Sequence, residues 1–245
     1  MFEQEFDTPQ SVQLEVTVGA GDIEVKSIEG QRSIVTLEGS SKQVEAVRVE
    51  LDGDRLVVQQ RRKSLLGFLE RWDDPLRVRV SVPVGSDVEI VTASSEAKLD
   101  GSFRDLKLKS ASGGLRVIGE IAGAVRAQTV SGDVRLPGVG GTLTAKTVSG
   151  DVEADAVAGS VDASSVSGDV RVGSVREGTF AVHSVSGDVT VGIASGTSID
   201  VDAGSASGHL SSELPLGDTP SGSSGPTVVI RSKTVSGDFH VVRAA

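Results

Sequence analysis

Along most of the chain, apolar residues alternate with polar ones in short runs that are bounded by glycine and serine. The segment GDVRLPGVGGTLTAKTVS at 132–149 is typical, and its apolar positions are Val134, Leu136, Val139, Leu143 and Ala145. An alternation with a period of two predicts strands with one buried face. Glycine and serine at the ends of the runs predict tight turns. The pattern therefore predicts short strands joined by turns, with no helix in the repeated unit.

The segment recurs along the sequence. Four copies of the triplet SGD begin at serines that are 18, 18 and 19 residues apart, namely Ser131, Ser149, Ser167 and Ser186. Looser copies and a last SGD begin at Ser94, Ser112, Ser207 and Ser236, and an early copy, GAGDIEV, occupies 19–25. This period is too short for repeats built from paired helices.

A single unit of this kind cannot bury its own apolar face, but stacked units can, with a spacing of roughly 4.8 Å between neighbouring coils. Stacking in phase predicts one inward column of side chains, made by Val134, Val152, Val170, Val189 and Phe239. The predicted fold is all-β: a single-stranded parallel β-helix, or β-solenoid, with coils of about 18 residues.

Departures from the repeat predict how the chain is organised. We expect one elongated domain over 1–245, in which Asp52-Gly53 marks a hairpin. Its expected parts are less regular opening coils at 11–77 with an insertion at 61–75, regular coils at 78–210, a polar loop at 211–227 and a closing coil at 228–242.

Composition narrows the classes of partner. The formal net charge is −10 and the pI is about 4.8, which argues against nucleic acid or an anionic membrane as the main partner. The absence of cysteine excludes disulfides and thiolate metal sites. The segment MFEQEFDTPQ lacks the basic and apolar regions of a signal peptide, and no run of 18 apolar residues occurs. These features predict a soluble cytoplasmic protein without an integral membrane segment.

Three stretches carry a resemblance to a known family. They are the repeated [ST]-V-S-G-D-V, the segment VRVSVPVGSDVEIVTAS at 78–94, and VVIRSKTVSGDF at 228–239. Together they resemble the prokaryotic putative-adhesin family, domain-of-unknown-function family 4097, over about 11–242. The resemblance implies a toast-rack-like parallel β-helix. It brings no catalytic residues with it.

The aspartates of the SGD triplets are candidate ligands because stacking predicts that they form a column. They are Asp133, Asp151, Asp169 and Asp188. Calcium is one possible use of such a column, but calcium takes six to eight oxygens and each turn offers one carboxylate. The alternative is structural, with carboxylates that accept turn N–H groups and are balanced by nearby cations. We expect the structural role, and no metal or cofactor.

The predicted neighbours of the aspartates support that role. Two residues after each aspartate, on the same face, are Arg135, Glu153, Arg171 and Thr190, and the column continues to Arg116 and Lys98. Opposite charges that meet along and across coils favour this register over a slipped one. We therefore expect a ladder of charges along one face.

The histidines offer no catalytic arrangement in the sequence. His183, His209 and His240 occupy different positions of their repeats, so they suggest neither a metal triad nor a base with an orienting carboxylate. We expect that the protein is not an enzyme.

The segment RRKSLLGFLERW at 61–72 interrupts the β pattern and contains the only tryptophan. Its apolar residues recur at helical spacing, and the candidate partner-binding residues are Leu65, Phe68, Leu69 and Trp72. The segment would either cover an edge or an open end of the solenoid or dock a partner protein, with a membrane surface as a less favoured target.

These observations favour a non-catalytic scaffold or interaction protein with an unknown protein partner, present as a monomer or a small homo-oligomer. The alternatives are a calcium- or glycan-binding module that uses an outer face and, less favoured, a polysaccharide-active enzyme.

Overall fold

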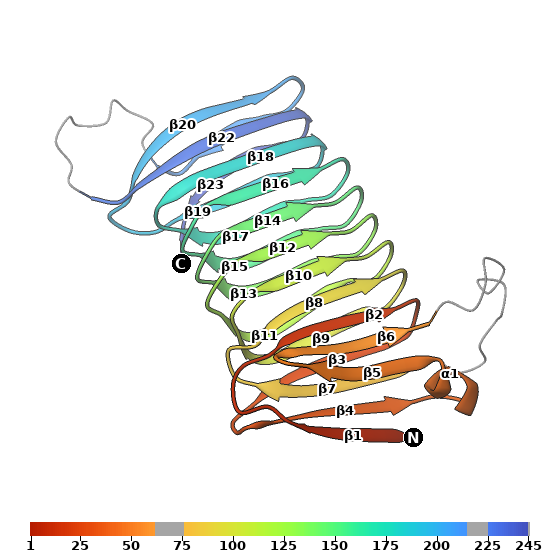
Figure 1. The fold of residues 1–245 in the computed structure, drawn as a ribbon. Coiled ribbons are helices and arrows are strands. Elements are labelled where there is room, and N and C mark those ends of the chain that lie inside the picture. Colours follow the sequence, from red (N-terminus) through yellow and green to blue (C-terminus); the bar gives the residue numbers. More distant parts are fainter. Residues whose placement is uncertain (62–75, 215–224, 245) are drawn as a thin grey trace.

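Two long β-sheets face each other in the computed structural model, which describes residues 1–61, 76–214 and 225–244 (Figure 1). One sheet has 12 strands and the other 11, and we name them sheet A and sheet B. Sheet A contains β1 (Phe2–Asp7), β3 (Asp22–Ile28), β4 (Arg32–Glu38), β7 (Arg77–Pro83), β9 (Glu96–Phe103), β11 (Leu115–Ile121), β13 (Val134–Val139), β15 (Val152–Val157), β17 (Val170–Val175), β19 (Val189–Ile193), β21 (Leu210–Ser212) and β23 (Phe239–Arg243). Sheet B contains β2 (Gln13–Val18), β5 (Val47–Asp52), β6 (Arg55–Gln60), β8 (Asp87–Thr92), β10 (Leu106–Lys109), β12 (Val125–Gln128), β14 (Leu143–Lys146), β16 (Val161–Ser165), β18 (Gly178–Ser186), β20 (Ser198–Ser205) and β22 (Thr227–Ser236).

From β8 to β19 the chain alternates between the sheets, so that each coil gives one strand to sheet B and the next to sheet A. Every strand pair in this part is parallel, and paired residues lie 18 or 19 positions apart, as Val134 with Val152 and Val170 with Val189 do. The predicted inward column is in register as far as Phe239, which pairs with Val189. The prediction of an all-β, mostly parallel solenoid is confirmed.

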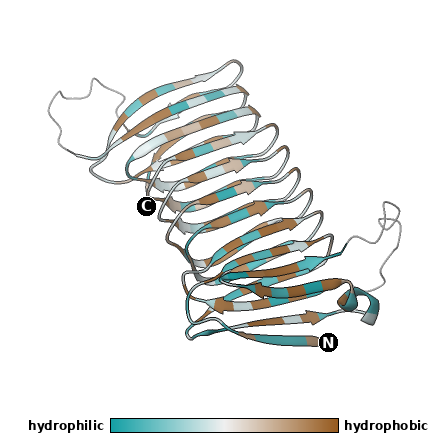
Figure 2. Cartoon of the chain, viewed as in Figure 1, coloured by the Kyte–Doolittle hydropathy of each residue, from teal (hydrophilic) through white to brown (hydrophobic). Residues whose placement is uncertain are grey.

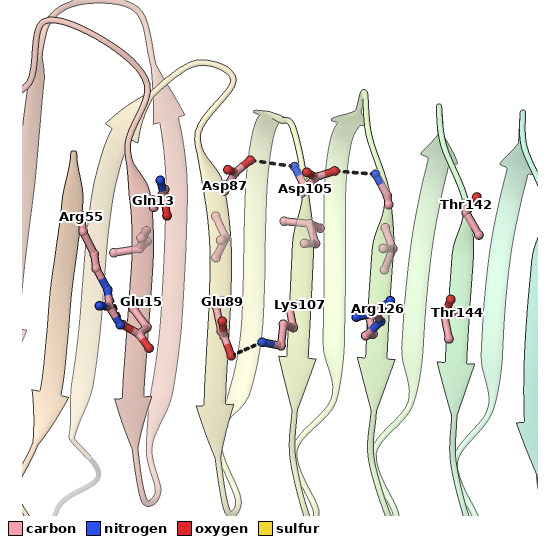
Figure 3. A pocket seen from close by; sticks show the side chains of 15 residues that line it. Gln13, Glu15, Arg55, Asp87, Glu89, Asp105, Lys107, Arg126, Thr142 and Thr144 are labelled. Atoms are coloured by element: carbon pink, nitrogen blue, oxygen red, sulfur yellow. Dashed lines mark hydrogen bonds and ion pairs between the residues drawn. The ribbon is translucent and has the colours of Figure 1, made fainter.

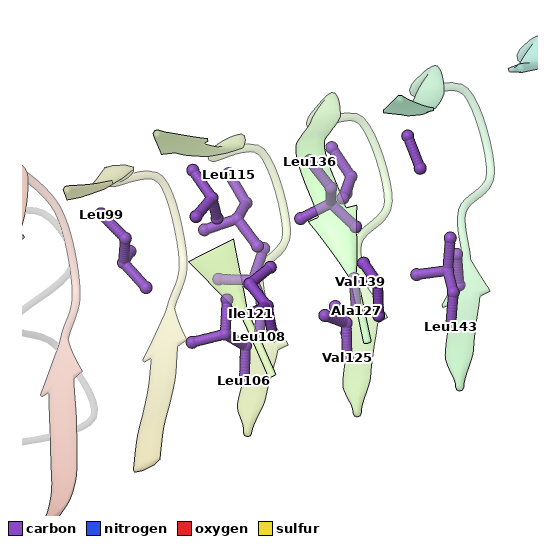
Figure 4. Close-up of a cluster of buried hydrophobic side chains, with 14 of the residues drawn as sticks. Leu99, Leu106, Leu108, Leu115, Ile121, Val125, Ala127, Leu136, Val139 and Leu143 are labelled. Carbon is purple, nitrogen blue, oxygen red and sulfur yellow. The ribbon is translucent and has the colours of Figure 1, made fainter. Parts of the chain in front are cut away.

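The core lies between the sheets and is made of the inward residues of both. Figure 2 shows the alternation of apolar and polar residues along the strands, and Figure 4 shows leucine, isoleucine and valine side chains of neighbouring coils in contact range between the sheets. Most of these side chains are small or branched, and the largest fully buried ones include Phe103, Phe180 and Phe239. Stacking of like residues in successive coils gives the core its continuity.

The first end of the stack departs from the parallel pattern. β1, β4 and β7 pair antiparallel in sheet A, and β5 and β6 form an antiparallel hairpin in sheet B. The predicted hairpin is present, but its loop is shifted by one residue to Gly53-Asp54, because Asp52 pairs with Arg55. Gly53 has a φ of 61°, which glycine adopts without steric cost. The short helix α1 (Ser41–Glu45) was not predicted, and it is held by a capping box between Ser40 and Gln43.

Chain order and spatial order differ at both ends of the stack. At the first end, the coil made by β2 and β3 is inserted between the coil of β8 and β9 and the coil of β6 and β7. At the other end, the coil made by β22 and β23 is inserted between the coil of β18 and β19 and the coil of β20 and β21. The segment at 228–242, expected to close the solenoid, is therefore the penultimate coil, and 198–212 is the outermost. Phe239 is buried between Val189 and Leu210, whereas Leu210 is half exposed. This order places the larger apolar side chain away from solvent.

Candidate functional site

The repeated turns connect sheet B to sheet A along one edge of the solenoid. In three successive SGD turns, a buried hydroxyl accepts a hydrogen bond from the glycine three residues later, as Thr147 Oγ1 does from Gly150 N at 2.8 Å and Ser165 Oγ from Gly168 N at 2.9 Å. The equivalent hydroxyls of the next two turns, Ser184 Oγ and Thr234 Oγ1, are buried without a hydrogen-bond partner among the described residues. Glycine is required at this position because neighbouring coils approach closely. A Cβ on Gly150 would lie 2.1 Å from the carbonyl oxygen of Gly132.

The SGD aspartates form the predicted column, and their carboxylates bind backbone. Asp133 Oδ1 accepts a hydrogen bond from Asp151 N at 3.1 Å, and Asp151 Oδ1 accepts one from Asp169 N at 2.9 Å. The series continues through Asp188 to Asp238 at 2.9 and 2.8 Å. Each carboxylate thus joins one coil to the next. Within the described ranges, no three or more acidic, histidine or cysteine side chains gather in a group that could hold a metal ion.

The predicted charge ladder is present on the outer face of sheet A. Glu153 lies between two arginines, with distances of 3.3 Å from Glu153 Oε2 to Arg135 Nε and from Glu153 Oε1 to Arg171 Nη1. Arg135 also contacts Asp133, at 3.2 Å from Nη2 to Oδ2. Lys98 and Arg116 continue the column in register. These pairs are exposed, and their role is mainly to favour this register.

Two of the three histidines come together, which the sequence did not predict. The intercalated coil brings His209 beside Asp238, whose Oδ1 accepts a hydrogen bond from His209 N at 2.8 Å. That N–H, together with the charges of His209 and His240, lowers the pKa of the Asp238 carboxyl from its ordinary value. His240 Nδ1 also lies 2.6 Å from Ser211 Oγ. This cluster depends on the coil of 198–212 lying next to the coil of 227–243, and the period of the repeat does not predict that order.

The candidate partner-binding residues Leu65, Phe68, Leu69 and Trp72 lie outside the described residues. Their assignment as a cap or a docking element stays a prediction.

A shallow hollow of about 450 Å³ lies on the outer face of sheet B, across β2, β8, β10, β12 and β14 (Figure 3). Most charges around it are paired: Glu15 Oε2 accepts a hydrogen bond from Arg55 Nε at 2.9 Å, and Lys107 Nζ lies 2.7 Å from Glu89 Oε1. Two aspartates at its edge, Asp87 and Asp105, accept hydrogen bonds from backbone N–H groups of the next coil.

Arg126 is the exception in this hollow. It is exposed on β12, and its guanidinium has no hydrogen-bond or ion-pair partner within the described part of the chain. Thr142 and Thr144 of the next coil are shorter, so they leave space beside it. The outward residues of sheet A were predicted, and those of sheet B were not. The same phase applied to sheet B would have placed Glu89, Lys107 and Arg126 in one row, as the pairing does.

The fold and the coil-to-coil ladders define the class of the protein: it is a repeat protein of the β-solenoid type. A family model described as Toastrack DUF4097 matches residues 11–242. The chain belongs to this family, as its repeated motif indicated. A comparison with curated proteins gives no match. Among the described residues, no helix is long and apolar enough to cross a membrane.

Solved structures share the fold at low sequence identity. A protein described as a putative adhesin from Bacteroides fragilis is 14% identical with a TM-score of 0.64, over 98% of this chain and 96% of that one. A protein described as a putative lipid binding protein from Parabacteroides distasonis is 15% identical with a TM-score of 0.61, over 99% and 96%. A second protein of that species, described as a putative adhesin, is 13% identical with a TM-score of 0.56, over 98% and 96%. At such identities the likeness concerns the fold.

Proposed function

We propose that this protein is a non-catalytic β-solenoid scaffold that binds a partner protein through the outer face of sheet B. The observation that carries the proposal is Arg126, an unpaired and exposed cation in a hollow where the other charges are largely paired. A guanidinium binds carboxylates in a bidentate manner, so an acidic side chain of the partner is the chemistry that fits. The names of the structural neighbours, which include putative adhesins, agree with a binding role.

The form of the surface supports an extended partner segment. Side chains on this face repeat in rows along the stack, with roughly 4.8 Å from one coil to the next. Lys107, Arg126 and Thr144 follow one another in such a row. A segment that runs along the stack would place one carboxylate on Arg126 and would pass over Lys107 and Thr144 on either side of it.

The test compares the chain with two variants that change charge equally. Arg126→Glu removes the proposed contact. Arg116→Glu is the matched control, because Arg116 is also exposed and has no ion-pair partner among the described residues but lies on sheet A. We expect a poly-glutamate peptide to bind the chain and the control, and to bind Arg126→Glu at least tenfold more weakly.

A second probe separates the proposed partner from the glycan alternative. Polygalacturonate offers carboxylates on a sugar backbone. Binding of the polysaccharide but not of the peptide would replace the protein partner by a glycan. Equal binding of either probe to Arg126→Glu and to the chain would refute the role of the hollow.

A further inference from the structure

The valine of each VSGD motif is exposed. The structure places Val130, Val148, Val166, Val185 and Val235 on the outer side of the repeated turns, at 48%, 44%, 46%, 49% and 54% exposure. The equivalent residues of the looser copies are Ala93, Ala111 and Ala206, which are also exposed. Each of these eight turns, which form the corners of the solenoid between sheet B and sheet A, therefore carries an exposed apolar residue. We call the row of five valines the corner ridge.

The corner ridge is continuous along the stack. Backbone hydrogen bonds join successive corners: Ser149 N donates to Val130 O at 2.8 Å and Ser167 N donates to Val148 O at 2.7 Å. Val235 follows Val185, because the residues on either side of them pair in register between β18 and β22. With roughly 4.8 Å per coil, the valines form an uninterrupted apolar strip about 20 Å long. Contiguous exposed apolar surface of this kind marks an interaction site.

The two sides of the corner ridge carry complementary chemistry at every level. Two residues before each valine, on the sheet B side, stands a side chain that can donate a hydrogen bond: Gln128, Lys146, Ser164, His183 and Lys233. Three residues after each valine, on the sheet A side, stands an aspartate: Asp133, Asp151, Asp169, Asp188 and Asp238. The aspartates use Oδ1 for the next coil, and Oδ2 of Asp151, Asp169 and Asp188 has no partner among the described residues.

We propose that the corner ridge is a homodimer contact in which two copies lie side by side with their stacking directions parallel. A two-fold axis along the stacking direction brings valine to valine at each level. It also places the donor side of one copy against the aspartate side of the other, so that Lys146 faces Asp151 of the second copy and Lys233 faces Asp238. A two-fold axis across the stack would instead place donors against donors and aspartates against aspartates. Charge complementarity therefore selects the parallel arrangement.

The corner is narrow, which sets the strength of the contact. The sheets are about 10 Å apart, so the edge offers much less than the roughly 800 Å² per partner of a standard interface. We expect a reversible dimer with a dissociation constant on the order of 100 µM. The contact is distinct from the hollow around Arg126, which lies on the face of sheet B and not on its edge.

Sedimentation across about 10 to 500 µM tests the dimer. The variant with Val148→Ser, Val166→Ser and Val185→Ser should dimerise at least tenfold more weakly, whereas Ile118→Ser, at an exposed position of sheet A, should not. Lys146→Glu should weaken the dimer without unfolding the chain. Its matched control is Lys109→Glu, which adds the same charge in the same row but at a corner where Gly114 replaces the aspartate. A chain that stays monomeric at the highest concentration, or equal effects of the two lysine changes, would overturn the proposal.

Cysteine cross-linking tests the parallel arrangement, because the chain has no cysteine of its own. Ser131→Cys and Ser236→Cys lie at opposite ends of the corner ridge. In the parallel dimer, each variant forms disulfide-linked dimers with itself under mild oxidation, and Ile118→Cys does not. Cross-linking only in a mixture of the two variants would show an antiparallel dimer and would refute the proposed symmetry. Failure of both tests would leave the proposed function of the hollow untouched, because neither variant set changes Arg126.

Discussion

Replacing Val152 by aspartate tests the inward register of the repeat most directly. Val152 is 1% exposed and lies between Val134 and Val170 in the middle of sheet A. The change removes about 1.5–3 kcal/mol of apolar burial, and it places a carboxyl group in the core, where an unpaired polar group costs a further 1–3 kcal/mol or more. We expect a total loss of about 4 kcal/mol or more in the free energy of unfolding.

The neighbouring residue provides the contrast. Glu153 points outward, and its side chain is 44% exposed. Glu153→Val loses two exposed ion pairs, which are worth about 0–1 kcal/mol in total, and valine suits a strand better than glutamate does. Val152→Thr is the matched control inside the core, since it keeps the shape and replaces one methyl group by a hydroxyl. We expect an intermediate loss of about 1–3 kcal/mol.

The assay is urea unfolding followed by circular dichroism, with thermal midpoints as a check because repeat proteins can unfold in more than one step. The expected order of stability is Glu153→Val close to the unchanged chain, then Val152→Thr, then Val152→Asp. Similar losses for Val152→Asp and Glu153→Val would refute the register. A loss for Val152→Thr as large as that for Val152→Asp would show that burial of a polar group, and not its charge, dominates the cost.

Three further predictions follow from the turns and ladders. Gly150→Ala should destabilise the chain by about 1–3 kcal/mol or more, because its Cβ would meet the Gly132 carbonyl oxygen. Gly138→Ala, whose Cβ would meet nothing within 4 Å, should stay within about 0.5 kcal/mol; equal effects in thermal melts would contradict the close approach. Glu153→Lys should replace the anion between Arg135 and Arg171 by a cation and cost about 1 kcal/mol or less, with the loss shrinking in high salt; melts at two salt concentrations check this, and a salt-independent loss would argue against it. The lowered pKa of Asp238 means that its ionised form stabilises the end of the stack above about pH 4 and that this contribution disappears as the pH falls through the lowered pKa. Hydrogen exchange of 198–212 should therefore separate the chain from Asp238→Asn at pH 6, and the difference should shrink as the pH falls below about 4; a difference that grows in acid would contradict the assignment.

Much of the regular part could be predicted from the sequence because the repeat fixes a phase. Once Val152 is inward, Glu153 is outward, and the same phase holds for every copy. The column of Val134 to Phe239 and the contacts of Glu153 follow from that alone.

The order of the end coils could not be predicted for the same reason. Near-identical copies present nearly the same edges, so a coil that fits on β18 and β19 by its period can come from 198–212 or from 227–243. The choice depends on details that a period does not contain. One is the pairing of Phe239 with Val189, and another is the bond from His209 N to Asp238. The corner ridge also escaped prediction, because exposure at a turn depends on how the chain bends there. The row of Glu89, Lys107 and Arg126, in contrast, follows from the phase of the repeat on sheet B.

The intercalation of β22 and β23 has a consequence for how the protein is made. Residues 198–212 leave the ribosome before 227–243, yet they dock onto β22 and β23 and not onto β18 and β19. At about 5–20 residues per second, synthesis of the stretch from 212 to 243 takes roughly 2–6 s, while strand pairing takes microseconds. During that interval the edges of β18 and β19 are unpaired, and β20 and β21 could pair with them in place of β22 and β23. The native order therefore requires that β22 and β23 pair with β18 and β19 in place of β20 and β21. The strands that are synthesised later are inserted between two coils that are synthesised earlier.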